Sequence, residues 1–129
     1  MKISILGLAA ALVVGALTTA QVARAEYPEK PVHLIVPAAP GGAADSNARV
    51  MATELGKRLG QPVVIENKPG ASGAIGMDAV AKAAPDGYVI GSNNLATFIV
   101  GTLTAKQLPY RVDQDFTPIS GLFTQPNVV

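Results

Sequence analysis

The sequence predicts an α/β protein in which helices cover both faces of a parallel sheet. Short apolar segments alternate with helical segments along the chain, in the order strand, helix, strand, helix, strand. The connections between these segments are only a few residues long. This alternation calls for parallel strands joined by right-handed crossovers, with each helix packed on the sheet.

The first strand and the first helix carry the clearest signals. Val32–Val36 reads VHLIV between Pro31 and Pro37, a β-branched apolar run typical of a buried strand. A helix follows over Asp45–Leu59, and Gly60 is expected to end it in a left-handed conformation. The buried stripe of this helix, with a period of about 3.6 residues, is predicted at Ala48, Met51, Ala52, Leu55 and Leu59.

The later elements follow from the same rules. A second strand is predicted at Pro62–Glu66, a second helix from about Gly73 to Ala83 and a third strand at Tyr88–Gly91. The apolar side of the second helix is predicted at Ile75, Ala79, Val80 and Ala83. After the third strand we expect a short helix within Leu95–Leu103, a loop over Gln107–Asp115 and a strand near Ile119–Phe123.

Residues 1–25 have the pattern of an export signal that is removed from the mature protein. Lys2 precedes an apolar run over Ile3–Leu17, and Ala23-Arg24-Ala25 has the small-x-small pattern that signal peptidase accepts. An uncleaved anchor is the alternative, although the run is shorter than the roughly 20 residues of a membrane span. Cleavage after Ala25 would leave residues 26–129 as one exported domain.

Charge and cysteine content exclude several classes of function. Two of the 10 basic residues lie in the leader, so residues 26–129 carry 8 basic and 9 acidic side chains. This near-neutral balance provides no basic patch for nucleic acid. The chain has no cysteine for disulfides or thiolate metal sites, and its single histidine, His33, has no second histidine for a metal pair. We therefore expect no metal and no cofactor, and a partly covered strand position for His33.

Three loops at the carboxyl edge of the sheet form the predicted ligand site. In an open parallel sheet, ligands bind beyond the carboxyl ends of the strands. The loops Pro37–Asp45, Asn67–Gly73 and Ser92–Thr97 leave that edge and lack bulky side chains. The first two deliver helix N-termini, whose free N–H groups attract an anion such as a carboxylate. The predicted ligand-binding residues are Pro40, Gly41, Gly42, Ala43, Ala44, Asp45, Gly70, Ala71, Ser72, Gly73, Ser92 and Asn93.

Other interpretations of these loops stay open. Gly41-Gly42 could form only a tight turn, with Asp45 as the helix cap. The nucleotide fingerprints do not match, since no Gly-Lys-Ser/Thr ending is present and Gly70-x-x-Gly73-x-x-Gly76 is not G-x-G-x-x-G. A hydrolase-like enzyme that uses Ser72 or Asp45 is a further alternative. The segment Gly70–Ala74 lacks the last glycine of a nucleophile elbow and no histidine follows it, so we expect no catalytic residue.

A series of sequence motifs runs through nearly all of residues 26–129. The segment starts with EYPxKPVxLIVP, followed by PGGxxDxxAR at Pro40–Arg49. Further motifs are GQPVVIENKPGASGxIG at Gly60–Gly76, AVAKAxPDGY at Ala79–Tyr88, LPY at Leu108–Tyr110 and DFxPI at Asp115–Ile119. In combination these motifs resemble the Bug-type receptors, which are the periplasmic solute-binding proteins of tripartite tricarboxylate transporters.

This resemblance implies a receptor with two lobes of the type II periplasmic-binding-protein fold that close over a small organic acid. It implies that backbone N–H groups and small hydroxyls of the three loops hold a carboxylate of the ligand. It also implies the permease subunits of the transporter as partners, and a monomer at full length. An extracytoplasmic receptor of this kind is the function that the sequence predicts.

The chain departs from the family in two respects. Many relatives carry Phe-Pro at the position of Ala38-Ala39, and Thr or Ser at the position of Ala44. The chain is also shorter than a complete receptor, so residues 26–129 are expected to be a partial first lobe, without the second lobe. A truncated reading frame or a fragment would explain this length, and a remnant that binds no ligand is the alternative.

Overall fold

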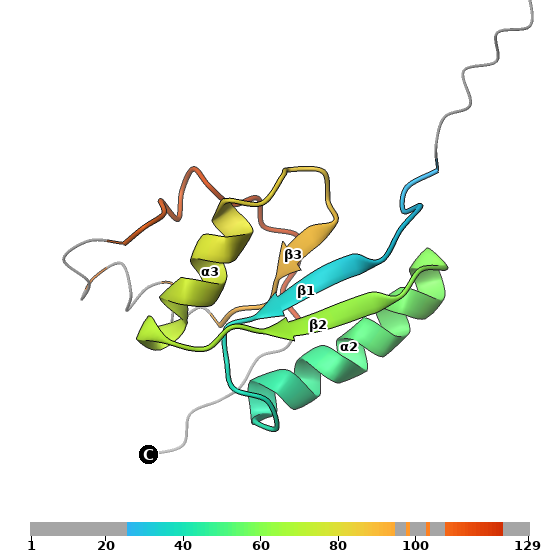
Figure 1. The fold of residues 1–129 in the computed structure, drawn as a ribbon, viewed down its shortest axis with the longest axis horizontal. Coiled ribbons are helices and arrows are strands. Elements are labelled where there is room, and N and C mark those ends of the chain that lie inside the picture. Colours follow the sequence, from blue (N-terminus) through green and yellow to red (C-terminus); the bar gives the residue numbers. More distant parts are fainter. Residues whose placement is uncertain (1–25, 95–97, 99–102, 104–107, 123–129) are drawn as a thin grey trace, which may run out of the picture.

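A computed structural model describes residues 26–94, 98, 103 and 108–122 of the chain. Its centre is a sheet of three parallel strands, β1 (Val32–Val36), β2 (Val63–Asn67) and β3 (Val89–Gly91). The strands lie in the order β2-β1-β3, with β1 in the middle (Figure 1). Every residue of β1 has a partner in β2, and residues 33–35 also have partners in β3. The predicted parallel sheet is confirmed.

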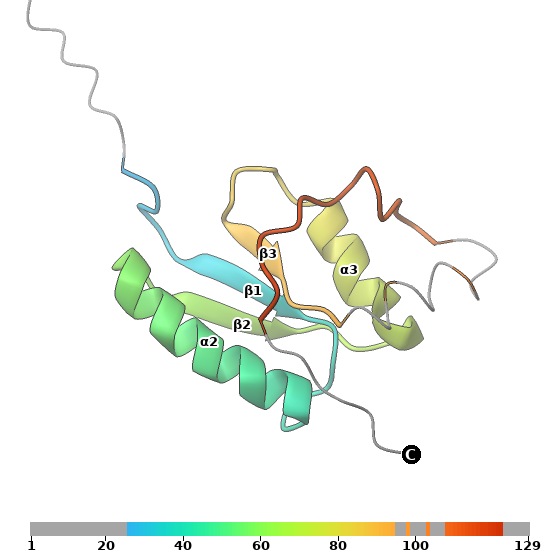
Figure 2. The ribbon, with the colours of Figure 1, turned by 180° about the vertical axis from the view of Figure 1, so that it is seen from behind.

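Two helices cover opposite faces of this sheet. The first, α2 (Ala43–Leu59), packs on β1 and β2. The second, α3 (Ala74–Ala81), follows the short 3-10 turn η1 (Ala71–Gly73) and packs on β1 and β3. Figures 1 and 2 show the sheet between the two helices from both sides. The predicted α/β fold with helices on both faces is therefore confirmed.

The core between α2 and the sheet joins large strand residues with small helix residues. Leu34 and Val36 are fully buried and pack against Ala48 and Ala52 of α2. Burial of each of these two strand side chains contributes about 1.5–3 kcal/mol to stability. Because successive strand residues point to opposite faces, these two face α2 and Ile35, between them, faces α3.

The end of α2 agrees with the prediction, whereas its start lies two residues earlier. Gly60 has φ 68° and ψ 8°, the left-handed conformation expected after the last helical residue. At the start Gly42 is the N-cap, and no side-chain hydrogen bond caps it. The alternative with Asp45 as the cap is wrong, because Asp45 is the third helical residue and its carboxylate reaches back to the N–H of Gly41.

The buried side of α3 agrees only partly with the predicted one, since Val80 packs against Gly91 of β3. Ile75 is 56% exposed, whereas Gly76 and Met77 are buried. The helix packs so closely that a Cβ on Gly76 would lie 2.8 Å from the Cβ of Pro37 and 2.9 Å from the carbonyl oxygen of Lys68. Among the large apolar residues only Met77 and Val80 mark this face, and its closest contact is made by a residue with no side chain, which a pattern of apolar residues does not indicate.

The strand predicted near Ile119–Phe123 is wrong for the residues that the structure describes. Residues 116–122 form neither helix nor strand (Figure 2). Ile119 is 80% exposed. A strand needs partners for its backbone N–H and C=O groups, and none of the described strands pairs with this segment. The loop predicted at Gln107–Asp115 is confirmed over residues 108–115. Phe123 and most of Leu95–Leu103 lie outside the described residues.

The described chain begins at Glu26, directly after the predicted leader. The Tyr27 hydroxyl donates a hydrogen bond to the Gly87 carbonyl at 2.7 Å, which joins this entry segment to the turn before β3. Residues 1–25 lie outside the described residues, so the export signal stays a prediction. Within the described part of the chain, no helix is both long enough and apolar enough to cross a membrane.

Candidate ligand-binding site

The carboxyl ends of all three strands lie at one edge of the sheet, and their loops begin side by side. The N–H of Lys68, after β2, donates to the carbonyl of Val36 at 2.9 Å. The N–H of Ser92, after β3, donates to the carbonyl of Ile35 at 2.9 Å. Both loops therefore start next to the end of β1. In open α/β sheets whose strand order begins 2-1-3, such an edge is where ligands bind.

A hydrogen-bond network holds the loop between β1 and α2. The Asp45 carboxylate, in a residue that is only 2% exposed, accepts at Oδ2 from the Gly41 N–H at 2.9 Å and from Arg49 Nε at 2.8 Å. Its Oδ1 accepts from Asn67 Nδ2 at 3.0 Å. The same Asn67 amide donates to the Ala38 carbonyl at 3.1 Å. The network therefore joins the loop, α2 and the end of β2.

The negative charge of Asp45 is compensated inside this network. The hydrogen bond from Arg49 is the largest cause that holds the Asp45 pKa well below its usual range, and the Gly41 N–H and Asn67 lower it further. The Asp45 carboxylate in turn raises the pKa of Arg49. Asp45 is thus ionised at neutral pH, and donors from the protein occupy both of its oxygens.

The loop between β1 and α2 is exposed and carries only short side chains. Pro40, Gly41, Gly42, Ala43 and Ala44 are all exposed. The first N–H groups of an α-helix have no partner within the helix, and no side chain caps this one. Together with the helix dipole, such groups favour a negatively charged oxygen atom.

The turn between β2 and α3 has an unusual backbone conformation. Gly70, Ala71, Ser72 and Gly73 have φ values of 119°, 46°, 54° and 92°. The Gly73 N–H donates to the Gly70 carbonyl at 2.9 Å, which closes the turn. Since Gly73 is left-handed, α3 begins at Ala74, and no side-chain hydrogen bond caps it. The first three residues of the turn are exposed and Gly73 is buried.

The loop after β3 contributes two half-buried polar residues, Ser92 and Asn93. The Asn93 Oδ1 accepts a hydrogen bond from the Asn94 N–H at 2.9 Å. Its Nδ2 is buried, and among the described groups it has no hydrogen-bond partner. The rest of this predicted loop, residues 95–97, lies outside the described residues.

The single histidine lies away from these loops. His33 is the second residue of β1, and its Nδ1 is 2.6 Å from Glu66 Oε1, with both side chains about 40% exposed. The hydrogen bond from His33, with a further contribution from Lys68, lowers the pKa of Glu66. In the part of the chain that the structure describes, no group of three His, Asp or Glu side chains could hold a metal ion.

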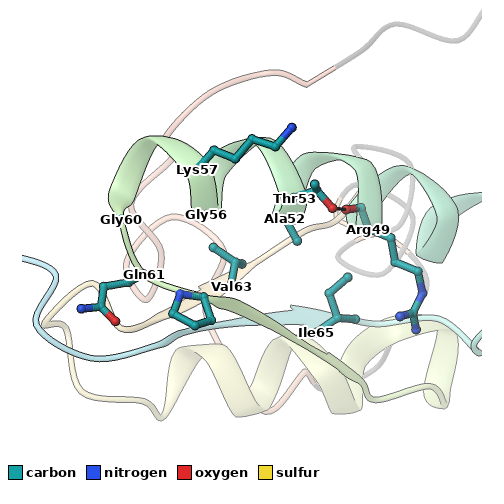
Figure 3. A pocket seen from close by; sticks show the side chains of 10 residues that line it. Arg49, Ala52, Thr53, Gly56, Lys57, Gly60, Gln61, Val63 and Ile65 are labelled. Atoms are coloured by element: carbon teal, nitrogen blue, oxygen red, sulfur yellow. Dashed lines mark hydrogen bonds between the residues drawn. The ribbon is translucent and has the colours of Figure 1, made fainter.

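An open groove between α2 and the outer edge of β2 was not predicted (Figure 3). It is lined by Arg49, Ala52, Thr53, Gly56, Lys57, Gly60, Gln61, Pro62, Val63 and Ile65. None of the predicted ligand-binding residues lines it. Arg49 connects the groove to the loop network through its bond to Asp45. Two small residues four positions apart on the helix, Ala52 and Gly56, are the sequence signal that could have indicated it.

Arg49 and Asn67 are the residues of the loop network that the sequence prediction did not include. Arg49 could have been found, because it lies four residues after Asp45 and therefore on the same side of the helix. Asn67 gave a weaker signal as a polar residue at the end of an apolar strand. Its partner is 22 residues away in sequence, so no local pattern pairs the two.

Comparison with known proteins identifies the family. The sequence profile of the tripartite tricarboxylate transporter family receptor (TctC) matches residues 47–129. This chain belongs to that receptor family. The resemblance inferred from the sequence motifs is thereby confirmed. The chain is 45% identical over 104 residues to the protein BugT of Bordetella pertussis, and the match covers 80% of this chain and 32% of BugT.

Solved structures agree with this assignment. MatC from Rhodopseudomonas palustris, with bound malate, matches this receptor chain with a TM-score of 0.68 and 42% identity, over 71% of this chain and 31% of MatC. A periplasmic transporter matches with a TM-score of 0.61 and 45% identity, over 65% of this chain and 28% of its own. The chain spans about a third of the length of the curated relatives that it matches.

Proposed function

We propose that this receptor chain binds a carboxylate of a small organic acid at the carboxyl edge of its sheet. The observation that carries the proposal is that two helices without side-chain caps, α2 and α3, begin at loops that leave this one edge. Each helix start favours an anion by about 0.3–1 kcal/mol when exposed, and by up to about 2 kcal/mol when partly buried. Two such ends acting on one carboxylate provide useful selectivity without a cationic side chain.

The predicted residues take different parts in this proposal. The backbone N–H groups of residues 42–44 and of residues 70–72 donate to the carboxylate, whereas the N–H groups of Gly41 and Gly73 bond within their own loops and, like Pro40, shape them. The hydroxyls of Ser72 and Ser92 and the Nδ2 of Asn93 supply further donors, the last of which lacks a partner among the described groups. Asp45 is buried and fully hydrogen-bonded, so it positions the first loop and does not contact the acid.

Two solved relatives support the choice of ligand. MatC contains malate, and a second R. palustris protein, with 41% identity and a TM-score of 0.50, contains adipate. Both ligands are dicarboxylates, so we propose a di- or tricarboxylate or a related organic acid. A second lobe would complete the site in a full-length monomeric receptor. The permease subunits of a tripartite tricarboxylate transporter would receive the acid from it.

The proposed place of action is the periplasm, after removal of residues 1–25. Export with its own leader in a bacterial host should yield a protein that begins at Glu26. Mass spectrometry of the periplasmic fraction measures this directly. A protein that keeps its leader in the membrane fraction would contradict the proposal and favour an uncleaved anchor.

An enzyme that uses Ser72 finds no support among the described residues. A nucleophilic serine needs a base within hydrogen-bond reach. The only histidine of the chain, His33, stands near the amino end of β1 and is bonded to Glu66. Ser72, in contrast, lies beyond the carboxyl end of β2.

The exposed residue Ala44, the second residue of α2, allows a direct test. Aspartate at this position favours the helix, but its carboxylate would occupy the place of the bound anion. We expect Ala44→Asp to keep or raise the unfolding temperature while it weakens malate binding by about tenfold or more. The neutral control Ala44→Asn should change the affinity by less than about threefold.

Calorimetry of the 129-residue chain with malate, adipate and citrate, beside the corresponding neutral diamides, measures these affinities. Heat with the acids and none with the diamides supports the proposal. Equal malate affinities of the aspartate and asparagine variants would contradict it. A cooperatively melting chain that binds none of the acids would favour the non-binding remnant.

A further inference from the structure

We propose that Asn67 is a positioning residue of the ligand site, which fixes the loop between β1 and α2 against the end of β2. Its side-chain amide performs this role through Asp45. The proposal rests on the proposed function for its effect on affinity, but its structural content can be measured without any ligand.

The contacts of Asn67 show why one side chain can hold the whole loop. Its Nδ2 donates to the Ala38 carbonyl at 3.1 Å and to Asp45 Oδ1 at 3.0 Å. Ala38 stands near the start of the loop, and Asp45 stands just inside the helix that follows it. A single NH₂ group therefore bridges the two ends of the segment that contains Gly41 and Gly42.

The chemistry of Asp45 explains why its partner on β2 has to be a hydrogen-bond donor. An ionised carboxylate only accepts hydrogen bonds. All three of its described neighbours, the Gly41 N–H, Arg49 Nε and Asn67 Nδ2, are donors. Of these three, only Asn67 belongs to a strand, since Gly41 lies in the loop itself and Arg49 lies in α2. Without Asn67 the network would still hold the loop to its own helix, but not to the sheet.

This link determines how the N-terminus of α2 is oriented relative to the turn that precedes α3. β2 leads into the turn at 70–73, so Asn67 connects the loop that begins α2 with the strand that leads to α3. Loss of the link would let the exposed residues 42–44, with their N–H groups, move relative to the turn at 70–73. The two helix starts would then act on one carboxylate less effectively, although each would remain intact.

The test compares Asn67→Ala with Asn47→Ala in the 129-residue chain. Asn47 is an exposed residue of α2 and provides the matched control. For Asn67→Ala we expect the amide proton signal of Gly41 to shift and its hydrogen exchange to accelerate. We also expect the malate affinity to fall about tenfold. Asn47→Ala should leave all three measurements unchanged.

Asp45→Asn disrupts the same network from the other side, because the new NH₂ group would face a donor whichever way the side chain turned, either Asn67 or the pair Gly41 and Arg49. This variant keeps the test valid where Asn67→Ala does not fold. The effects of the two substitutions on Gly41 exchange should be less than additive in the double variant, since both break one network.

Additive effects, or a Gly41 signal that does not respond to either substitution, would overturn the positioning role. A parent chain that binds none of the acids overturns the proposed function instead. The Gly41 signal of Asn67→Ala then still shows whether Asn67 fixes the loop between β1 and α2 to β2. A loss of affinity in Asn67→Ala without any change at Gly41 would show that Asn67 acts by another route, and would also overturn the proposal.

Discussion

The two glycine-rich connections that begin α2 and α3 leave the same edge of the sheet, yet different forces hold them in shape. Side-chain hydrogen bonds from Asp45 and Asn67 hold the loop between β1 and α2. The turn at 70–73 is held by its backbone, with four successive residues at positive φ and hydrogen bonds from the Gly73 N–H to Gly70 and from the Ala74 N–H to Ala71. The two connections therefore have a similar composition, but side-chain hydrogen bonds hold the first in shape and backbone conformation holds the second.

The two connections also differ in the unfavourable free energy that the rest of the structure has to offset. In the first loop the buried carboxylate needs donors for both oxygens, and the loop, helix and strand each supply one. In the second turn Ala71 and Ser72 are left-handed, which costs about 1–2 kcal/mol for each non-glycine residue. Packing of α3 must offset this strain. Substitutions should therefore act differently in the two connections.

The largest contrast is expected between alanine at Gly70 and alanine at Gly41. Gly70 has φ 119° and ψ 155°, a region that is essentially restricted to glycine, and an added Cβ would meet Ile75 Cδ1 at 2.7 Å. Gly41 has φ 83° with nothing within 4 Å of an added Cβ. We expect Gly70→Ala to lower the free energy of unfolding by about 3 kcal/mol and Gly41→Ala by about 1–2 kcal/mol. Urea denaturation measures both, and equal losses would contradict the contrast.

The next effect is expected where the two connections touch the same helix. Gly76 of α3 lies against Pro37 from the first loop and Lys68 from the second. Gly76→Ala would force these backbones apart at a cost of about 1–3 kcal/mol, offset by up to about 1 kcal/mol of helix propensity. The control is Gly56→Ala in α2, where the nearest atom, the Gln61 carbonyl oxygen, is 3.3 Å from the added Cβ.

Gly56→Ala should change the free energy of unfolding by less than about 0.5 kcal/mol, since propensity and crowding nearly cancel there. A Gly76→Ala variant as stable as Gly56→Ala would show that the contact between α3 and the two connections is looser than the structure indicates. The same urea titrations decide between these outcomes.

Acidification should weaken the first loop selectively. Asp45 has a folded pKa held below its ordinary value of 3.8, so its contribution is fully present well above pH 3.8 and is lost as the pH falls toward the folded value. Asp45→Asn lacks this contribution, so the difference in unfolding temperature between parent and variant should shrink by about half or more from pH 5 to pH 2. The pKa of Glu66 is also lowered, but Glu66 is present in both the parent and the variant, so its titration does not contribute to the difference between them. A difference that does not vary with pH would contradict the compensated charge of Asp45.

The smallest effect is expected at Ser72. Glycine at this position removes the left-handed strain of about 1 kcal/mol, and the greater freedom of glycine in the unfolded chain cancels most of the gain. We expect Ser72→Gly to change stability by between zero and about 0.5 kcal/mol in the favourable direction. Ser46→Gly, on the exposed surface of α2, should instead lose about 0.5 kcal/mol. A destabilised Ser72→Gly would indicate that the hydroxyl supports the turn.

Local patterns were sufficient for the elements whose signals are local. The apolar run of β1, the helical period of α2 and the left-handed Gly60 lie within a few residues of the structure they specify, and all three predictions are confirmed. The parallel order followed from short connections, since strand and helix must alternate to cover the sheet. Sequence reasoning also located the two loops that lack bulky side chains, because small residues can be read directly from the sequence.

Only the tertiary structure decided which groups meet across the chain. The bond between Asn67 and Asp45 and the fit of Gly76 against two connections depend on partners far away in sequence. Residues 116–122 form no strand, because none of the described strands pairs with them. Hydrogen bonds and close packing between such partners require both surfaces to be in place, whereas period and turn preference act within a few residues. The amino-acid sequence thus determined the sheet, its two helices and the bare loops, and the assembled fold determined how those loops are held.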